Sequence, residues 1–360
     1  MTLQDLRNSI DSIDDQLLAL LNDRMALVQQ VGELKRTTNT LIYRPEREKH
    51  IVDRLVHINS KSSGILNLSA IEAIFLEIFA VARNIELPER IAFLGPEGSF
   101  THQAAESRFG AMSEYLVLPT IRSIFESVET GRAKFGVVPI ENNQEGMVSE
   151  TIDLLCDTNL VIAAEVLMPI HFAFATTCER LQDITQIYSK DIAFRQCGKF
   201  LRDSFDPEKT VQVPVESTSK AAKLAAQNPN SAAICSPIAA KLFGVPVLFE
   251  NLEDSAQNRT RFLIIAKDFE NQPSGADKTT IAAILPNTDK AGVLADFLKD
   301  FKDRNINIIK IESRPLRLGA DFKFWFLLEV EGHRHDPLLK NIFELHADSL
   351  RWLGSYIKVV

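Results

Sequence analysis

The stretch RIAFLGPEGSF, residues 90–100, marks the point where the chain changes its pattern. Five residues typical of a buried strand lead into a turn with two glycines, and a helix-forming run follows. Before this stretch the apolar residues keep a helical spacing, and after it short apolar strands alternate with helical segments. The sequence therefore predicts a multidomain protein, with an all-helical domain in residues 1–88 and an α/β domain that begins at residue 89.

The composition is that of a globular protein. A chain of 360 residues is too long for one ordinary hydrophobic core, so we expect more than one domain. A net charge of -8 gives no support for a nucleic-acid or membrane-surface role. No apolar run approaches the length of a spanning helix, and the N-terminus lacks the pattern of a secretory signal. The four cysteines lie far apart, which argues against structural zinc and a disulfide framework. We therefore expect a cytoplasmic protein.

Two apolar rows with seven-residue spacing predict one long helix that ends near residue 36. The rows are Leu3, Ile10, Leu17 and Val31, and Leu6, Ile13, Leu20, Leu27 and Leu34. A helix of about 50 Å, at 1.5 Å per residue, cannot bury this stripe within 88 residues, so other helices or another subunit must cover it. Two further helices are expected over residues 46–58 and 69–85.

Charged residues interrupt the apolar face of this first helix. Arg24 occupies a position of the first row, and Lys35 returns to the same face eleven residues later. A snorkelling surface arginine is the alternative, but the apolar rows on both sides turn Arg24 inward, where a guanidinium needs a partner. Together with Arg44, Arg47 and Glu48, these cations predict a pocket for a small dianion.

The segment LRNSIDSIDDQLLALLNDRMALVQQVGELK, followed by YRPERE, resembles the all-helical chorismate mutase domain. The resemblance implies an intertwined dimer and the rearrangement of chorismate to prephenate without a cofactor. It places Arg24, Lys35, Arg47 and, from the other subunit, Arg7 on the carboxylates and the ether oxygen of chorismate. It places Glu48 on the ring hydroxyl.

Three further chorismate contacts follow from the same resemblance. Arg44 and Ala82 stand where the family often has an acid and a serine. Glu86 stands where a donor to the ether oxygen is needed, so we expect this carboxyl group to be protonated. The candidate catalytic residues of the mutase are therefore Arg24, Lys35 and Glu86.

Residues 89–270 alternate strands with helices, which predicts an α/β domain with much parallel sheet and two lobes around a cleft. Polar phrases follow or begin several strands: GPEGSF (95–100), VVPIENN (137–143), ESTS (216–219) and NRTRF (258–262). Ligands gather at such positions in open sheets, although ESTS alone is equally typical of a helix cap. We expect these phrases to line one cleft.

In this order, FLGPEGSF, VVPIEN, QC, ESTS and NRTRF resemble prephenate dehydratase, over roughly residues 90–268. The resemblance implies a fold like that of periplasmic binding proteins and the conversion of prephenate to phenylpyruvate. It assigns catalytic Thr260 to the departing hydroxyl, and Arg261 is the candidate for a substrate carboxylate. The other candidate prephenate contacts are Ser99, Glu141, Asn142, Gln196, Ser217 and Thr218.

Strand alternation complicates this assignment. In a regular strand Thr260 points to one face, while Arg259 and Arg261 point to the other. Thr260 and Arg261 can share the cleft only if the backbone is irregular and the regular strand starts near Phe262. Which arginine contacts substrate therefore stays open.

After the polar segment NQPSGADK (271–278), residues 277–360 follow the order βαββαβ, an α+β ferredoxin-like unit. The phrases AGVLADFL and ESRP resemble those of the ACT domain, which implies L-phenylalanine binding at a subunit interface and feedback inhibition of the dehydratase. Gly292 allows close approach of a ligand. The candidate phenylalanine contacts are Gly292, Val293, Leu294, Glu312, Ser313 and Arg314. A packing unit without a ligand is the alternative.

The three resemblances predict a bifunctional chorismate mutase and prephenate dehydratase of L-phenylalanine biosynthesis with an ACT domain. An arogenate-preferring dehydratase is one alternative, because no feature separates a keto from an amino side chain. A ligand-sensing regulator on a solute-binding scaffold is another, but it leaves Arg24, Lys35, Arg47 and Glu48 unexplained. We expect a homodimer or higher homo-oligomer, with no cofactor, metal, nucleic acid or membrane as a partner.

Overall fold

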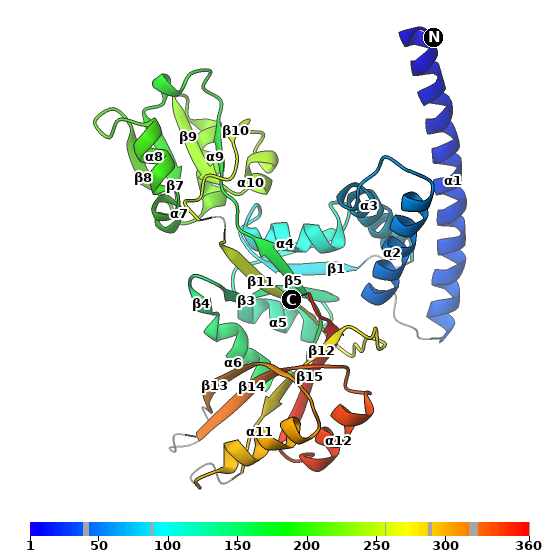
Figure 1. Cartoon of the computed structure of the whole chain (residues 1–360). Coiled ribbons are helices and arrows are strands. Elements are labelled where there is room, and N and C mark those ends of the chain that lie inside the picture. The colour runs from blue at the N-terminus through cyan, green and yellow to red at the C-terminus, as the bar shows by residue number, and fades with distance from the viewer. Residues whose placement is uncertain (39–42, 87–88, 256, 287–289, 317–322, 360) are drawn as a thin grey trace. The chain divides into compact units, whose positions relative to one another are not determined.

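The computed structural model describes residues 1–38, 43–86, 89–255, 257–286, 290–316 and 323–359. The chain forms two compact units (Figure 1). The first comprises residues 1–89 with 109–114, and the second comprises residues 90–108 with 115–360.

The first unit is helical. It contains α1 (Leu3–Thr38), α2 (Pro45–Lys61) and α3 (Leu68–Glu86). The helices expected from the apolar spacing are all present, and the 36-residue α1 extends well beyond the other two (Figure 1). The nine residues of its two apolar rows remain 44–65% exposed. Neither α2 nor α3 therefore covers the stripe that the sequence requires to be buried.

The first lobe of the second unit contains a sheet in the order β2-β1-β3-β11-β5, with the short β4 paired to β3. Its strands are β1 (Arg90–Leu94), β2 (Glu114–Leu118), β3 (Phe135–Asn142), β4 (Gly146–Met147), β5 (Val161–Pro169) and β11 (Arg259–Ala266). Its helices are α4 (Phe100–Phe109), α5 (Ile121–Glu129) and α6 (Ser149–Asp157). β1 and β3 are parallel, but β11 runs antiparallel to both of its neighbours. The sheet is mixed because β11 returns to it after the chain has passed through the second lobe.

The second lobe contains a sheet in the order β10-β6-β9-β7-β8, in which β7 is parallel to β8 and β9. Its strands are β6 (Ala173–Thr176), β7 (Gln186–Ser189), β8 (Val211–Pro214), β9 (Ser231–Cys235) and β10 (Val247–Phe249). Its helices are η1 (Leu181–Asp183), α7 (Asp191–Gln196), α8 (Gly198–Ser204), α9 (Thr218–Gln227) and α10 (Pro237–Leu242). Buried alanines of α9, including Ala221 and Ala225, allow this helix to pack closely on the sheet.

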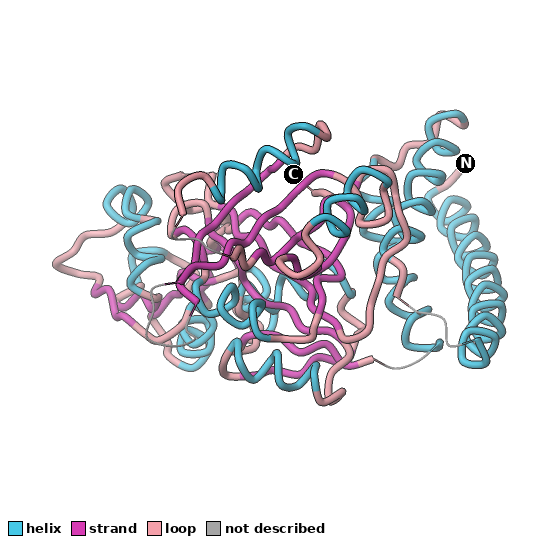
Figure 2. Tube along the Cα trace, turned by 90° about the horizontal axis from the view of Figure 1, so that it is seen from below, coloured by secondary structure: helices cyan, strands magenta, loops and turns pink. Residues whose placement is uncertain are grey.

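The C-terminal domain has a sheet in the order β13-β14-β12-β15 with all neighbours antiparallel. Its elements are β12 (Asp277–Ala283), α11 (Val293–Asp303), β13 (Ile308–Leu316), β14 (Lys323–Glu331), α12 (Pro337–Leu345) and β15 (Leu350–Ile357). Figure 2 shows helices around the strands of the second unit. This element order and this strand order confirm the ferredoxin-like unit.

The first lobe and the C-terminal domain share one hydrophobic core. Val138, Ile162 and Leu263 of the lobe belong to the same buried cluster as Trp325 and Leu353 of the C-terminal domain. The main chains also approach closely, since a Cβ at residue 354 would lie 2.3 Å from the carbonyl oxygen of residue 162. Only glycine fits this contact, and its φ of 152° is rare for other residues.

Candidate functional sites

In the helical unit, α1 and α3 meet where Gly32 lies against Glu86. A Cβ on Gly32 would stand 3.1 Å from Glu86 Cα, so a larger residue would push the helices apart. Lys35 follows about one turn later and donates a hydrogen bond to Glu86 Oε2 at 2.7 Å. Both side chains are largely buried, with 17% and 11% exposed. The structure thus brings together two of the three candidate catalytic residues of the mutase.

Arg24 lies on the same side of α1. Its guanidinium carbon is 5.9 Å from the centre of the Phe79 ring of α3. Burial lowers the pKa of Arg24, and the carboxylate of Glu86 opposes this effect. The inward orientation expected from the apolar row is therefore observed.

Glu48, the candidate for the ring hydroxyl, is paired with Arg83 of α3. Arg83 is 7% exposed, donates to the Phe109 carbonyl at 2.8 Å, and lies 5.7 Å from the centre of the Tyr43 ring. Sequence reasoning missed this residue. The sequence feature that could have identified Arg83 is its place inside the apolar run IFLEIFAVARN, because a buried cation there requires a carboxylate partner.

The remaining mutase candidates lie elsewhere on the unit. Arg7 is exposed near the start of α1, about 42 Å along the helix from the ion pair at its other end. Arg47 is exposed and Ala82 is buried. Nε of Arg44 donates to Glu46 at 2.7 Å. The contacts of these four residues with chorismate stay predictions.

In the second unit, Thr260 of β11 lies opposite Asn142 of β3. Nδ2 of Asn142 donates to Thr260 Oγ1 at 2.9 Å. The direction of this amide is determined, because its Oδ1 accepts the backbone N–H groups of Gln144 and Glu145 at 2.9 and 3.0 Å. Since the Thr260 oxygen accepts a hydrogen bond from Asn142, the Thr260 hydroxyl can donate its own hydrogen bond to another group.

A chain of amide hydrogen bonds connects Asn142 with the second lobe. Nδ2 of Asn142 also donates to Asn258 Oδ1 at 2.8 Å, and Asn258 Nδ2 donates to Gln196 Oε1 at 3.2 Å. Gln196, at the end of α7, donates in turn to Gln144 Oε1 at 2.8 Å. The structure therefore connects three prephenate candidates, Thr260, Asn142 and Gln196. Asn258 is 4% exposed and was not a candidate, although it begins the phrase NRTRF.

The glycine turn after β1 is attached to the second lobe. The hydroxyls of Ser219 and Ser236 donate to carbonyls of this turn, and Ser236 reaches Gly98 O at 2.5 Å. Gly98 has a φ of 79°, and a Cβ there would lie 3.0 Å from Ser219 Oγ. Nδ1 of His102 accepts the Gly98 N–H at 3.1 Å, and burial lowers the pKa of His102.

Two of the serine candidates cap helices. Ser99 Oγ accepts the N–H of His102 at 3.2 Å, and Ser217 Oγ accepts that of Lys220 at 3.0 Å. Thr218 is 9% exposed at the start of α9. The helix-cap interpretation of ESTS is confirmed, and the contacts of Ser99, Ser217 and Thr218 with prephenate stay predictions.

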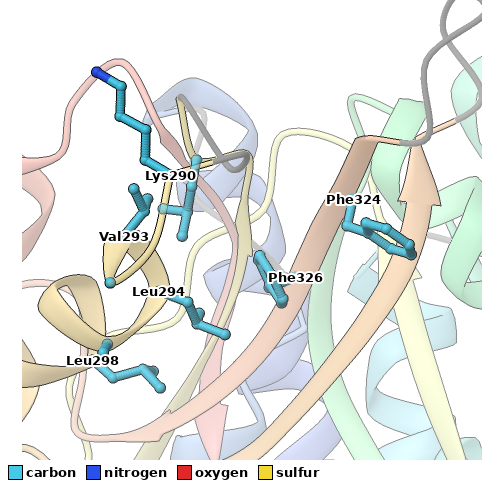
Figure 3. Close-up of a pocket in the computed structure, with 9 residues that line it drawn as sticks. Lys290, Val293, Leu294, Leu298, Phe324 and Phe326 are labelled. Carbon is cyan, nitrogen blue, oxygen red and sulfur yellow. The ribbon is translucent and has the colours of Figure 1, made fainter.

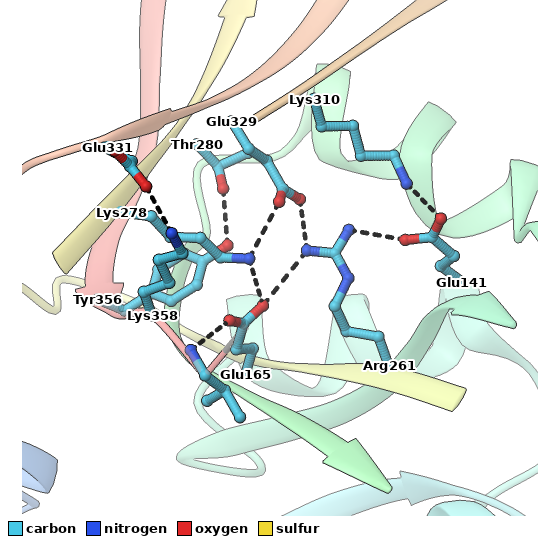
Figure 4. Close-up of polar contacts among 11 residues, drawn as sticks. Glu141, Glu165, Arg261, Lys278, Thr280, Lys310, Glu329, Glu331, Tyr356 and Lys358 are labelled. Carbon is cyan, nitrogen blue, oxygen red and sulfur yellow. Dashed lines mark hydrogen bonds and ion pairs between the residues drawn. The ribbon is translucent and has the colours of Figure 1, made fainter. Parts of the chain in front are cut away.

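Arg261 belongs to a group of six charged residues that we call the interdomain cluster (Figure 4). The cluster comprises Glu141, Glu165 and Arg261 of the first lobe with Lys278, Lys310 and Glu329 of the C-terminal domain. Arg261 lies 2.6 Å from Glu329, 3.1 Å from Glu141 and 3.3 Å from Glu165. Burial by itself lowers the pKa of Arg261, but the carboxylates, led by Glu329, raise it above its ordinary value.

The backbone near Arg261 is irregular on one side only. The register of β11 against β3 shifts between Arg261 and Phe262, whereas the pairing with β5 is regular from Arg259 to Ile264. Thr260 contacts the amide of Asn142, and Arg261 contacts the cluster, so the two side chains do not share a site. Because the guanidinium of Arg261 is already paired with three carboxylates, the geometry does not favour its predicted contact with prephenate.

The C-terminal domain has a pocket of about 500 Å³ at the start of α11 (Figure 3). It is lined by Leu285, Lys290, Gly292, Val293, Leu294, Ala295, Leu298, Phe324 and Phe326. Gly292 has a φ of 93° and precedes α11, so its main chain can approach a ligand closely. The lining is apolar with one ammonium group, which suits a small amphipathic molecule.

The other three phenylalanine candidates lie on β13. Arg314 donates to Asp153 Oδ1 of α6 at 2.9 and 3.2 Å, which connects it to the first lobe. Ser313 is exposed and Glu312 is half-buried. The structure thus places Gly292, Val293 and Leu294 at the pocket and the β13 residues outside its lining.

Two kinds of feature are absent from the described residues. No group of three or more His, Cys, Asp or Glu side chains lies close enough to hold a metal ion. No described helix is both long and apolar enough to cross a membrane.

The fold and the sites define a multidomain enzyme, with a cation-bearing helical unit, a two-lobed α/β domain and a small α+β domain with a pocket. Family models match the same parts: Chorismate mutase type II at residues 6–87, Prephenate dehydratase at 91–270 and ACT domain at 287–344. A "Bifunctional chorismate mutase/prephenate dehydratase" of Aquifex aeolicus (strain VF5) is 36% identical and covers 99% of this chain and 98% of its own. The chain belongs to the family of bifunctional chorismate mutase/prephenate dehydratases.

Two further comparisons agree. A relative with the same name from Stutzerimonas stutzeri is 37% identical over 99% of this chain and 98% of its own. The structure of a prephenate dehydratase in complex with L-Phe from Arthrobacter aurescens is 34% identical, with a TM-score of 0.66, over 75% of this chain and 90% of that chain. The resemblances in the sequence are thereby confirmed. The chain is an enzyme with chorismate mutase, prephenate dehydratase and ACT domains.

Proposed function

We propose that this chain forms prephenate from chorismate in the helical unit and phenylpyruvate from prephenate in the two-lobed domain, and that L-phenylalanine inhibits the second reaction through the ACT domain. The observation that carries the dehydratase assignment is the Thr260 hydroxyl, whose oxygen accepts from Asn142 and whose proton can serve substrate. The mutase assignment rests on the inward cations of α1, Arg24 and Lys35, and on the carboxylate of Glu86 in α3.

In the mutase, Arg24 and Lys35 bind the anionic substrate, and Glu48 accepts its ring hydroxyl. One C–O bond breaks as one C–C bond forms, so the protein acts by holding a compact conformer and stabilising charge on the ether oxygen. Lys35 leaves Glu86 for the ligand, and Glu86 then takes up a proton and donates to the ether oxygen.

The pH profile tests the role of Glu86. Mutase turnover should decline with rising pH in the wild type, because a deprotonated Glu86 cannot donate. A Glu86→Gln variant carries a permanent donor and should have a flat profile. Identical profiles would remove Glu86 from this role.

The helical unit acts as a homodimer in this proposal. The exposed apolar rows of α1 support it, because a second copy of α1 would bury them. An antiparallel partner would also bring its Arg7 to the site at Lys35. Refolding a mixture of Arg7→Ala and Lys35→Ala subunits should restore about a quarter of wild-type mutase activity, since half of the dimers carry one intact site. No recovery above the single variants would refute a shared site.

In the dehydratase, the bond between the ring and its carboxylate breaks and carbon dioxide leaves. The electron pair of that bond enters the ring, which becomes aromatic as hydroxide leaves. A hydrogen bond from Thr260 stabilises the departing hydroxide. Of the two arginines, exposed Arg259 is the better candidate for a substrate carboxylate, because the donors of Arg261 already face three carboxylates. Thr260→Ala should abolish dehydratase turnover and spare mutase turnover. Equal loss of both would contradict separate sites.

Regulation and substrate choice are tested together. Chorismate supplied to the enzyme should yield prephenate and then phenylpyruvate, and L-phenylalanine should suppress only the second product. The pocket at Gly292 supports this site for the amino acid. Faster turnover of arogenate than of prephenate would instead identify an arogenate-preferring enzyme.

A further inference from the structure

The interdomain cluster contacts the two strands that carry the Thr260–Asn142 pair. Arg261 follows Thr260 on β11, and Glu141 precedes Asn142 on β3. The strands pair in register here, with Thr260 opposite Asn142 and Arg261 opposite Glu141. The same short segment therefore presents the reacting hydroxyl and its amide partner to one site and two members of the cluster to the other. Figure 4 shows the two cluster members, Arg261 and Glu141.

The cluster joins complementary charges from two domains. The first lobe contributes one cation and two carboxylates, and the ACT domain contributes two cations and one carboxylate. Glu165 and Glu329 have side chains that are 1% and 4% exposed in the assembled protein, so the surrounding cations, and not water, balance their charges there. Glu141 and Lys310 lie at the rim, with 32% and 21% exposed. The charges of the lobe are balanced only when the ACT domain is in place.

We propose that Arg261 and Glu141 are positioning residues of the dehydratase, and that Lys310 and Glu329 of the ACT domain hold them in place. The ACT domain is thus a structural part of the dehydratase site. This inference rests on the proposed role of Thr260. The positioning effect is transmitted through the main chain, because a shift of Arg261 or Glu141 moves the adjacent Thr260 or Asn142 by a similar distance.

The same contacts give ligand binding a route to Thr260. Phe324 and Phe326 of β14 line the pocket, and Glu329 lies three residues later on the same strand, about 10 Å away. Lys310 lies on the neighbouring strand β13. A ligand that displaces β14 changes the contact between Glu329 and Arg261, and with it the position of the reacting hydroxyl.

The first test uses variants of the full-length protein without phenylalanine. Lys310→Met keeps about the same side-chain length at a position that is 21% exposed, and it removes the charge that faces Glu141. We expect dehydratase kcat to fall at least about fivefold with KM for prephenate nearly unchanged, because small misplacements of reacting groups slow the chemical step. Lys310→Arg should retain most of the activity. Lys358→Met is the matched control, since Lys358 pairs with Glu331 of its own domain.

The outcomes separate positioning from general loss of structure. Mutase turnover of the same preparation and its thermal unfolding report whether the chain is folded. An unchanged kcat in Lys310→Met, or an equal loss in Lys358→Met, would overturn the proposal. So would a rise in KM at constant kcat, because it would indicate a role in binding alone.

A second measurement needs no variant. Amide hydrogen exchange of residues 259–262 in the wild type should change when L-phenylalanine is added at a concentration that inhibits the dehydratase. Inhibition without any change in these amides would refute the route from the pocket. If phenylalanine neither binds nor inhibits, the proposed regulation fails, whereas the kcat comparison of the variants still decides the positioning role.

Discussion

Replacing Asn142 by Asp tests the direction of the hydrogen bond that prepares Thr260. In the wild type, Nδ2 of Asn142 donates to Thr260 Oγ1 at 2.9 Å, which leaves the threonine proton for the departing hydroxyl. An aspartate has nearly the same shape but only accepts. The Thr260 hydroxyl would then donate to the carboxylate instead of the substrate.

The magnitude follows from this competition. A hydrogen bond to a charged group contributes about 1.5–3 kcal/mol, and this interaction must be broken before the proton can serve the leaving group. Since about 1.36 kcal/mol corresponds to a factor of ten in rate, we expect dehydratase kcat to fall about 10- to 150-fold. The rate of phenylpyruvate formation from saturating prephenate measures this kcat directly.

The neighbouring asparagine provides a matched control. Asn143 lies in the same turn, and its Oδ1 accepts the N–H of Arg259 at 2.9 Å, a bond that aspartate can also make. Its Nδ2 donates to the Gln257 carbonyl, so Asn143→Asp loses an amide donor, as Asn142→Asp does. Asn143→Asp adds the same charge without contacting Thr260 and should retain most of the activity. If both variants lose activity equally, or if Asn142→Asp keeps wild-type kcat, the assigned orientation of Thr260 is wrong.

Three further predictions follow from contacts described above. Gly354→Ala places a Cβ against the carbonyl oxygen of Ile162 and should lower the unfolding free energy of the second unit by about 2 kcal/mol or more, measured by urea denaturation; an unchanged midpoint would refute the close approach. Nδ1 of His102 accepts a hydrogen bond from the Gly98 N–H only when the ring is neutral, and burial lowers the pKa of His102 from 6.5. The stabilisation that this bond gives above pH 6.5 is therefore lost as the pH falls through the folded-state pKa. Dehydratase activity should decline in that range, and His102→Phe should be slower but less dependent on pH. Arg83→Gln removes the cation that pairs with the largely buried carboxylate of Glu48 and should destabilise the helical unit by about 3 kcal/mol. Unchanged thermal unfolding would show that this ion pair contributes little.

The helical unit and the order of strands could be predicted because they depend on local spacing. The seven-residue spacing of the apolar rows predicts α1 and its apolar stripe, and this prediction does not depend on which helix or subunit covers the stripe. The inward orientation of Arg24 could be predicted for the same reason, because Arg24 lies between apolar residues on the same helix face. The mixed direction of the first sheet could not be predicted, because it depends on β11 returning from the second lobe.

The environment of Arg261 shows what a single sequence leaves open. Its carboxylate partners lie 68 to 120 residues away along the chain, on three different strands. Without these partners, a cation beside an essential threonine suggests a ligand for substrate. Asn258 and Arg83 were missed for a related reason, because their roles come from side chains that only the fold brings near.

The shared core between the first lobe and the ACT domain predicts how the protein responds to cleavage. Residues 272–276 between the two are exposed, so a protease can reach them. Cutting there would nick the chain without releasing a fragment, because Leu353 and Tyr356 stay buried in the common core and the N–H of Val359 remains bonded to Glu165. The nicked protein would migrate as one particle in gel filtration and keep its dehydratase turnover, whereas a gene truncated at the same place would leave apolar surface of the lobe uncovered. We therefore predict that residues 90–360 are the smallest part of this chain that keeps dehydratase turnover.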